Sequence, residues 1–536
     1  MNKQLKNIKL SLEEKAAQIL ISFRFGKKEI SDYCVKKGWG GLHLSIWDYK
    51  GIEESRVMIE EFRAKSKVPP FITSDTECGF GMVMLQEATE FTTSIGLAAS
   101  GDPALAYQAA AATAKEAKYV GLSWSYSPVV DINTNPLNPS TNIRSYGIDP
   151  EIVSKFALMT IKGYQENGLI ATAKHFPGQG HSCMNSHFSA EIIRRSREEM
   201  ENCELVSFEN SIRAGVETIM TNHAVYPSYD KENLVTFSHE IVSSLLKNKL
   251  GFKGIIITDC LEMGPIKKAF SVEDSVVKAI LAGHDIVLTE NDYEKSLFAV
   301  MNGLKKDKIR ESILDERIEK ILNLKFKYGL FNPLPDKNRM PDLKEHEELA
   351  KKIARASIRI EKNDRGILPL RKIKDSVKPL MLLLPEKTEK MDIGVHHREN
   401  KIEEILKAQH KNTEVLNVPY ELNSVSRESI LNSVREASAV IFDTSFKLSS
   451  GQIGTLNSSQ IELLKEIKKT NPSLVIIAVN PFALYQLPFA DTIVFSYSSN
   501  EFVLQALFET IFGKISGEGK LPASNDADFY NMMRTI

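Results

Sequence analysis

The stretch LIATAKHFPGQGHSCMNSH, residues 169–187, decides how the rest of the chain is interpreted. Its first five residues, LIATA, form an apolar run that is typical of a buried strand. Three histidines, a lysine and two glycines follow within the next fourteen residues. Each of these polar groups would need a partner inside a protein core. The segment after the strand is therefore predicted to be a surface loop that carries chemistry.

The same order of apolar strand, polar loop and helix recurs through residues 1–335. Continuous apolar strands that alternate with amphipathic helices indicate a parallel sheet, and eight such units favour a TIM-like (β/α)8 barrel. A doubly wound open sheet is the main competing fold, although no GxGxxG motif follows the first strand. The expected strands are 18–23, 39–45, 70–75, 122–130, 169–174, 218–222, 254–259 and 284–289, and expected helices include 104–118, 150–166 and 195–214.

A change of composition near residue 335 predicts a domain boundary. The segment FNPLPDKNRMPDLKEHE holds three prolines and many charges, as linkers do. We expect a barrel domain at 1–335, a linker at 336–350 and a C-terminal α/β sandwich domain at 351–536. In the second domain, strands are expected at 379–384, 439–442, 474–479 and 492–497, and helices at 345–357, 401–410, 426–437, 458–469 and 501–512.

Composition excludes several classes of function. A net charge of −1 argues against a general nucleic-acid binder. No apolar run approaches the roughly 20 residues of a membrane-spanning helix, and the N-terminus lacks the apolar segment of a signal peptide. The five cysteines are scattered without a CxxC pair, so reduced thiols are expected. These features predict a cytoplasmic protein without membrane or nucleic-acid partners, as a monomer or homodimer.

Polar side chains follow consecutive predicted strands and should meet at one end of the barrel. Five strand ends in a row carry them: Asp75 and Glu77 at the third, Asp131 and Asn133 at the fourth, Lys174 and His175 at the fifth, Asn222 and His223 at the sixth, and Asp259 at the seventh. The acid in GIIITDCLEMG, Asp259, suits a nucleophile or a general base. The alternative is a helix cap at Asp259, completed by Glu262 three residues later. For Lys174, the alternative is an ion pair with Asp75 that only closes the barrel end.

Three further residues are candidates on loops. His187 ends the glycine-rich loop and suits general acid/base chemistry, because a histidine pKa lies near neutrality by default. Asn185 can fix the tautomer of His187. Arg144 can bind hydroxyl or carbonyl oxygens. A hydrogen-bonded surface histidine and an arginine that pins its loop are the alternatives.

A zinc site is a minor possibility at the same loop. His181, Cys183 and His187 share it, and Cys78 and Cys260 fall near the same predicted mouth. However, the spacing H-x-C-x3-H is not a standard zinc pattern. We expect neither metal nor cofactor.

The chain resembles glycoside hydrolase family 3, and specifically its two-domain β-N-acetylhexosaminidase branch. That branch carries K-H-F-P-G-H-G-D-T-x-x-D-S-H, which aligns with KHFPGQGHSCMNSH. Further similarity lies in SDTECG, SPVVDINTNPLNPSTNIRSYGIDP, AGVETIMTNHAVYP and GFKGIIITDCLEMG, and in SIRIEKNDRGILPL and ISGEGKLPAS of the C-terminal half. The matches occur in the family's order over nearly the whole chain.

The resemblance implies a retaining exo-β-N-acetylglucosaminidase that works through a covalent glycosyl-enzyme and acts on small glycosides or cell-wall fragments. By position, Asp259 is then the nucleophile, His187 the general acid/base and residue 185 its dyad partner. Asp75, Arg144, Lys174, His175 and His223 are expected to bind the sugar.

This chain departs from the family's pattern at Gln179, His181 and Asn185, where the branch has His, Asp and Asp. An asparagine can orient His187 but brings no charge to stabilise the imidazolium. His181 is a candidate to replace the missing partner in part. Three alternatives stay open: phosphorolysis of the same bond, another β-glycosidase specificity, and sugar binding without catalysis.

Overall fold

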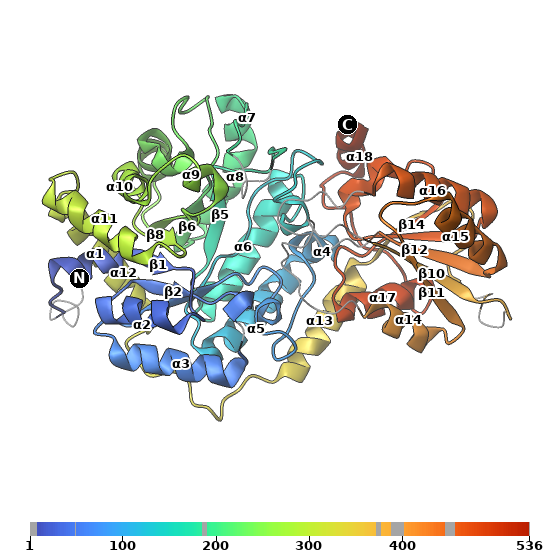
Figure 1. The fold of residues 1–536 in the computed structure, drawn as a ribbon, viewed down its shortest axis with the longest axis horizontal. Coiled ribbons are helices and arrows are strands. Elements are labelled where there is room, and N and C mark those ends of the chain that lie inside the picture. The colour runs from blue at the N-terminus through green and yellow to red at the C-terminus, as the bar shows by residue number, and fades with distance from the viewer. Residues whose placement is uncertain are drawn as a thin grey trace.

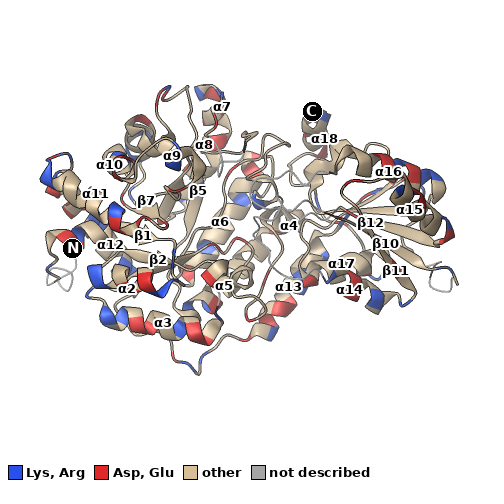
Figure 2. Cartoon of the chain, viewed as in Figure 1, with Lys and Arg blue, Asp and Glu red and all other residues tan. Residues whose placement is uncertain are grey.

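The computed structural model describes residues 8–48, 50–184, 190–370, 373, 377–386, 401–444 and 456–534. Figure 1 shows two bodies side by side, with the N-terminal one coloured blue to yellow and the C-terminal one orange to red. Within the described ranges, no helix is long and apolar enough to cross a membrane. Lys, Arg, Asp and Glu are interspersed along outer helices of both bodies (Figure 2).

Eight parallel strands form the first body. One sheet has the order β4-β3-β2-β1-β8 and another the order β5-β6-β7. Isolated parallel bridges, Trp124 to Ile170 and Ile257 to Ile286, connect the two sheets into a closed ring. The (β/α)8 barrel expected from the sequence is confirmed. The strands are β1 (Leu20–Ser22), β2 (Gly41–His43), β3 (Phe71–Ser74), β4 (Trp124–Ser125), β5 (Thr172–Phe176), β6 (Thr218–Thr221), β7 (Ile255–Thr258) and β8 (Val287–Thr289).

Every residue of these eight strands is buried. Side chains on one face of a strand fill the barrel interior, and those on the other face meet the surrounding helices. This two-sided burial explains the unbroken apolar sequence of segments such as Ile255–Thr258.

Helices surround the barrel. The segment 195–214, expected as one helix, forms two, because Cys203 leaves the helical region with φ −131° and ψ −84°. Segment 240–249 adopts wider π-helical turns. The helices are α1 (Leu12–Gln18), α2 (Lys28–Lys37), α3 (Ile52–Lys65), α4 (Ser94–Ala99), α5 (Pro103–Val120), α6 (Pro150–Glu166), α7 (Arg197–Asn202), α8 (Glu204–Arg213), η6 (Glu240–Lys249), α9 (Gly264–Lys267), α10 (Val272–Ala282), α11 (Tyr293–Lys305) and α12 (Glu311–Lys327).

The second body is a six-stranded sheet with the order β11-β10-β12-β13-β14-β9, in which β9 alone is antiparallel. Helices cover both faces, as expected. Side chains of α13, α14 and α17 pack on one face, and those of α15, α16 and α18 on the other. The elements are α13 (Leu343–Ser357), β9 (Arg359–Asn363), β10 (Leu380–Pro385), α14 (Ile402–Gln409), β11 (Thr413–Val418), α15 (Ser424–Glu436), β12 (Ala439–Asp443), α16 (Ser458–Thr470), β13 (Leu474–Ala478), β14 (Thr492–Phe495), α17 (Glu501–Ile511) and α18 (Asp526–Arg534).

The two bodies share a core. Ile95, Ala99 and Ile143, which belong to the barrel sequence, lie in the apolar cluster of the second sheet. Backbone hydrogen bonds reinforce this contact: the Lys520 amide donates to the Ala99 carbonyl at 2.7 Å, and the Ile148 amide to the Pro522 carbonyl at 3.1 Å. The loop that carries Arg144 is therefore supported from behind by the second body.

Candidate active site

A cavity of about 480 Å³ opens at the carboxyl ends of the barrel strands. Its lining includes five of the site residues expected from the sequence: Asp75, Arg144, Lys174, His175 and Asp259. They come from four separate segments, after β3, on η4 (Asn142–Arg144), on β5 and after β7. The described residues that line the cavity all fall between Phe23 and Glu290, so they belong to the barrel.

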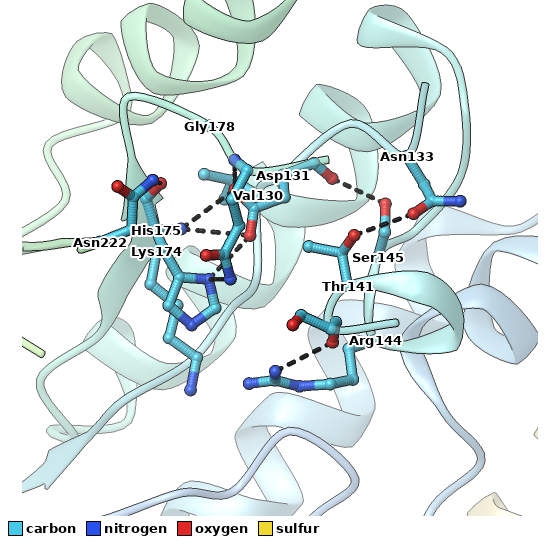
Figure 3. Close-up of polar contacts among 12 residues, drawn as sticks. Val130, Asp131, Asn133, Thr141, Arg144, Ser145, Lys174, His175, Gly178 and Asn222 are labelled. Atoms are coloured by element: carbon cyan, nitrogen blue, oxygen red, sulfur yellow. Dashed lines mark hydrogen bonds and ion pairs between the residues drawn. The ribbon is translucent and has the colours of Figure 1, made fainter. Parts of the chain in front are cut away.

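Four charged side chains form one connected network on the cavity wall. Arg144 binds Glu77 through two hydrogen bonds, Nε to Oε2 at 2.8 Å and Nη2 to Oε1 at 2.7 Å. The Lys174 ammonium lies 2.7 Å from Glu77 Oε1 and 2.8 Å from Asp75 Oδ1. In Figure 3, the Lys174 and Arg144 side chains extend toward the same space. Two cations and two carboxylates leave this network with no net charge.

Burial and pairing act against each other on these groups. Burial alone would raise the pKa of Glu77, but Arg144 and Lys174 hold it well below its usual range. Burial alone would lower the pKa of Lys174. The attraction of the Asp75 and Glu77 carboxylates is larger than this effect, so the pKa of Lys174 is raised. Glu77 and Lys174 are therefore both charged near neutral pH. The fixed donors and acceptors of the network suit neighbouring hydroxyl groups of a sugar.

Asp131 orients His175. Its carboxylate is fully buried and accepts hydrogen bonds from His175 Nδ1 at 2.7 Å and from the Gln179 amide at 2.8 Å. Because an ionised carboxylate can only accept, the Nδ1 proton of His175 points at Asp131. Nε2 is then the ring nitrogen left to meet a substrate. Figure 3 shows Asp131 beside the His175 ring.

Asp259 follows β7 directly and lines the cavity. Its Oδ1 accepts the Cys260 amide at 2.7 Å. The alternative of a helix cap completed by Glu262 is wrong, because helix α9 has no side-chain cap at its N-terminus. Glu262 instead accepts the backbone amides of residues 290, 291 and 292 at 2.6, 2.5 and 3.0 Å.

His223 is buried and is not among the lining residues of the cavity. Its expected contact with the sugar stays a prediction. Its Nδ1 meets the Thr236 hydroxyl at 2.6 Å, and its Nε2 meets the Cys260 carbonyl at 3.0 Å. Burial lowers the pKa of His223, so the neutral ring donates from Nε2 to Cys260. This contact ties the His223 ring to the segment that begins at Asp259.

The loop after β5 is held against the barrel as far as Met184. Gly180 is needed because a Cβ there would lie 1.7 Å from the Ile132 carbonyl oxygen. Glu191 binds the start of the loop, accepting the amides of Cys183 at 2.9 Å and Met184 at 3.1 Å. The Val225 amide donates to the Glu191 carbonyl at 2.8 Å. The side chain of Glu191, which follows residue 190, thus binds the residues just before position 185. Asn185 and His187 themselves lie outside the described residues.

Two of the possible zinc ligands, His181 and Cys183, have other partners. His181 Nδ1 contacts the Thr134 hydroxyl at 3.1 Å, and the Cys183 thiol donates to Glu191 at 3.2 Å. Among the described residues, no group of three or more His, Cys, Asp or Glu side chains is placed to hold a metal.

His43 was not singled out from the sequence. Glu77 and Asp131 were recognised only as acids at strand ends, without an assigned partner. Their partners lie 67 and 44 residues away, which no local pattern reveals. His43 is stacked between Phe23 and Tyr126 at 4.0 and 5.1 Å, and burial lowers its pKa to about 4. It forms a neutral, aromatic part of the cavity wall.

Comparison with known proteins identifies this architecture. The profile described as the glycosyl hydrolase family 3 N terminal domain matches residues 11–324. A β-N-acetylglucosaminidase/β-glucosidase of Cellulomonas fimi is 26% identical over 495 residues, which cover 88% of this chain and 86% of that protein. A β-hexosaminidase A of Pseudoalteromonas piscicida is 30% identical over 352 residues, 61% of this chain and 58% of that one.

Solved structures agree over both bodies. A family 3 β-N-acetylglucosaminidase from Paenibacillus sp. str. FPU-7 superposes with a TM-score of 0.86 at 25% identity, covering 96% of this chain and 99% of that one. A β-glucoside phosphorylase, BglX, bound to 2FGlc also has a TM-score of 0.86 at 25% identity, with coverage of 98% and 97%. The family profile and the solved structures together show that this two-domain protein is a glycoside hydrolase. The chain belongs to glycosyl hydrolase family 3.

Proposed function

We propose that this protein is an exo-acting β-N-acetylglucosaminidase that retains anomeric configuration. The observation that carries the proposal is that Asp259 lines the same cavity as Asp75, Arg144 and Lys174, three members of the ion-paired network completed by Glu77. The names of relatives that span most of the chain support N-acetylglucosamine (GlcNAc) as the sugar.

In this mechanism, Asp259 attacks C1 of the bound sugar while His187 protonates the oxygen of the leaving group. The bond from C1 to that oxygen breaks and a covalent glycosyl-enzyme forms. The deprotonated His187 then removes a proton from water, whose oxygen displaces Asp259 from C1. Asp75, Arg144 and Lys174 hold the hydroxyl groups, and His175 Nε2 contacts the sugar beside them.

Phosphorolysis is the second candidate. Asn185 brings no negative charge to the acceptor side, so a phosphate anion is repelled less than it would be by the usual aspartate. The likeness to a β-glucoside phosphorylase supports the same alternative. In that case phosphate replaces water and the product is a sugar 1-phosphate.

One experiment separates these reactions. The protein is incubated with aryl β-GlcNAc, aryl β-glucoside and aryl β-xyloside, each with and without phosphate, and the sugar product is identified by NMR. Free GlcNAc at a rate independent of phosphate supports the proposal. GlcNAc 1-phosphate identifies a phosphorylase, and turnover of glucoside or xyloside alone identifies another specificity. Binding of GlcNAc glycosides without turnover identifies a sugar-binding protein.

Substitutions test the roles. Asp259→Asn should abolish the covalent intermediate, seen as a mass increase of one sugar after rapid acid quenching of the wild type. His187→Ala should lose most activity on poor leaving groups and little on activated aryl groups, since the latter need little protonation. Asn185→Asp should raise hydrolysis if the missing charge limits turnover.

The proposal extends to cellular context and domain division. Free thiols at all five cysteines support a reducing compartment, and we place the protein in the cytoplasm, acting on small cell-wall fragments as a monomer or homodimer. We divide the chain into a barrel at 1–335, a linker at 336–350 and a sandwich at 351–536. The barrel strand β8 (Val287–Thr289) precedes this linker and the sandwich strand β9 (Arg359–Asn363) follows it, which supports the division, although helix α13 (Leu343–Ser357) begins inside the linker.

A further inference from the structure

His43, the last residue of β2, lines the cavity but takes no part in the proposed reaction. Its ring is packed between two aromatic rings. The Phe23 ring lies 4.0 Å away with 17° between the ring planes, and the Tyr126 ring lies 5.1 Å away with 11°. Because both faces of the imidazole are covered, its polar contacts are restricted to its edge, where the two nitrogens lie.

The two ring nitrogens of His43 have different neighbours. Nδ1 lies 3.0 Å from the Thr73 hydroxyl on the adjacent strand β3, and Nε2 lies 3.6 Å from Oδ2 of Asp75. A hydroxyl can donate or accept, whereas a carboxylate that is paired with the Lys174 ammonium is an acceptor. The ring proton therefore belongs on Nε2, facing Asp75, and Nδ1 accepts a hydrogen bond from Thr73.

His43 is a neutral donor at this position. Burial lowers the pKa of His43 to about 4, and the Lys174 ammonium acts in the same direction. The surrounding carboxylates, Asp75 first among them, offset this effect only in part. At neutral pH the ring therefore directs an N–H dipole at Asp75 and adds no charge to the ion-paired network. Asp75 has a donor beside each oxygen, Lys174 at Oδ1 and His43 at Oδ2.

We infer that His43 is a positioning residue, which fixes the direction in which Asp75 presents Oδ2 to a hydroxyl group of the bound sugar. The side chain of Asp75 is 34% exposed and that of His43 only 1%, so the sugar meets Asp75 and His43 acts through it. At 3.6 Å the Nε2–Oδ2 pair attracts electrostatically, and a shortening of about 0.7 Å makes it an ordinary hydrogen bond. A carboxylate with a donor at both oxygens offers its remaining lone pairs in fixed directions, which favours one hydroxyl over its absence.

This inference rests on the proposed function in that Asp75 binds the sugar, and kinetics on single hydroxyl groups test it. An aryl β-glycoside is compared with its 3-deoxy, 4-deoxy and 6-deoxy derivatives. His43→Phe keeps the aromatic stack and loses the donor, so kcat/KM for the parent should fall by about tenfold, as for one lost hydrogen bond. One deoxy derivative, which lacks the hydroxyl bound by Asp75 Oδ2, should lose little more in this variant. His43→Gln, whose amide can replace the Nε2 donor, should keep most of the parent activity.

The outcomes separate positioning from general damage to the cavity wall. An equal loss on the parent and all three derivatives, or no loss on the parent, overturns the inference. His284→Phe is the matched control, because His284 is fully buried and bound to the Thr221 hydroxyl at 2.9 Å, but does not line the cavity. It should leave the ratios between the glycosides unchanged. The series is built on the sugar that the wild type cleaves fastest or, without turnover, binds most tightly, in which case dissociation constants replace kcat/KM.

Nitrogen chemical shifts give a test that does not depend on turnover or on the folding of a variant at the cavity wall. In wild-type protein labelled with nitrogen-15 histidine, His43 should show a protonated Nε2 and an unprotonated Nδ1 at pH 7. Its signals are identified by their absence from His43→Gln. A proton on Nδ1, or a charged ring at pH 7, overturns the inference. If the expected kinetic pattern is found on glucosides and GlcNAc glycosides are not cleaved, the proposed GlcNAc specificity fails while the role of His43 stands.

Discussion

Replacing Glu77 with glutamine removes the carboxylate that binds both Arg144 and Lys174. The side chains of Glu77 and Lys174 are 5% and 3% exposed, so neither cation is well solvated after the change. Lys174 keeps Asp75 at 2.8 Å, and Arg144 keeps the Ser140 carbonyl at 3.1 Å. The network would pass from neutral to a charge of +1.

The expected loss of unfolding free energy follows from this unpaired positive charge. Breaking a buried ion pair by removing one partner costs about 3–5 kcal/mol. Because Lys174 retains Asp75, we expect the lower end, about 3 kcal/mol of unfolding free energy. The double variant Glu77→Gln/Arg144→Gln restores neutrality, so its loss should be about 2 kcal/mol smaller than the sum of the two single losses.

The assay is urea unfolding followed by tryptophan fluorescence. All three tryptophans lie in the barrel, so the signal reports barrel unfolding separately from the sandwich. The folded-state pKa of Glu77 is lowered, so its stabilisation is present above the unfolded pKa of about 4.3 and declines as pH falls below it. The difference between wild type and Glu77→Gln should therefore be constant from pH 5 to 8 and shrink in acid. Additive losses in the double variant would refute the reasoning.

Three further predictions follow from other contacts. Asp131→Asn should lower kcat/KM by about 30-fold, the equivalent of one lost charge-assisted hydrogen bond of about 2 kcal/mol, because His175 loses its orienting partner; steady-state kinetics would measure it, and full activity would contradict it. Glu191→Gln should reduce kcat more for alkyl than for activated aryl leaving groups, because glutamine keeps one acceptor oxygen and its nitrogen cannot accept the second of the two backbone amides; an equal loss on both would count against this role. Burial lowers the pKa of Lys325 well below its usual value, so the folded state binds fewer protons and stability should rise with pH toward about 10. Lys325→Met should unfold at higher urea concentration at pH 7 and lose that pH dependence; an unchanged slope would exclude Lys325 as its source.

The barrel was predictable because its strands are buried on both faces. Ile255–Thr258, for example, has three isoleucines in a row, and its four residues are all buried. Two strands of the sandwich were missed for the opposite reason. Strand Arg359–Asn363 is half-buried throughout, and Thr413–Val418 lies at a sheet edge with exposed positions, so neither has a continuous apolar run.

The site was predictable only in part. A polar residue after a strand identifies the end of the barrel, so Asp75, Lys174 and Asp259 were recognised by position. The same rule selected His223, whose ring is held by Thr236 and Cys260. The direction in which each side chain points at the open end of the barrel depends on packing between distant segments. The local sequence does not contain this information. The roles of Asn185 and His187 stay predictions.

The peptide that joins Ile143 to Arg144 connects two parts of the protein with different tasks. Ile143 packs in the apolar cluster of the C-terminal sheet, and Arg144, the next residue, binds Glu77 at the cavity. A shift of the sandwich would therefore move a guanidinium that belongs to the charged wall, although the described cavity lining comes from the barrel alone. For protein engineering, the two domains are not interchangeable modules. A chimera that joins this barrel to another C-terminal domain would inherit a different placement of Arg144, and with it an altered preference for the sugar.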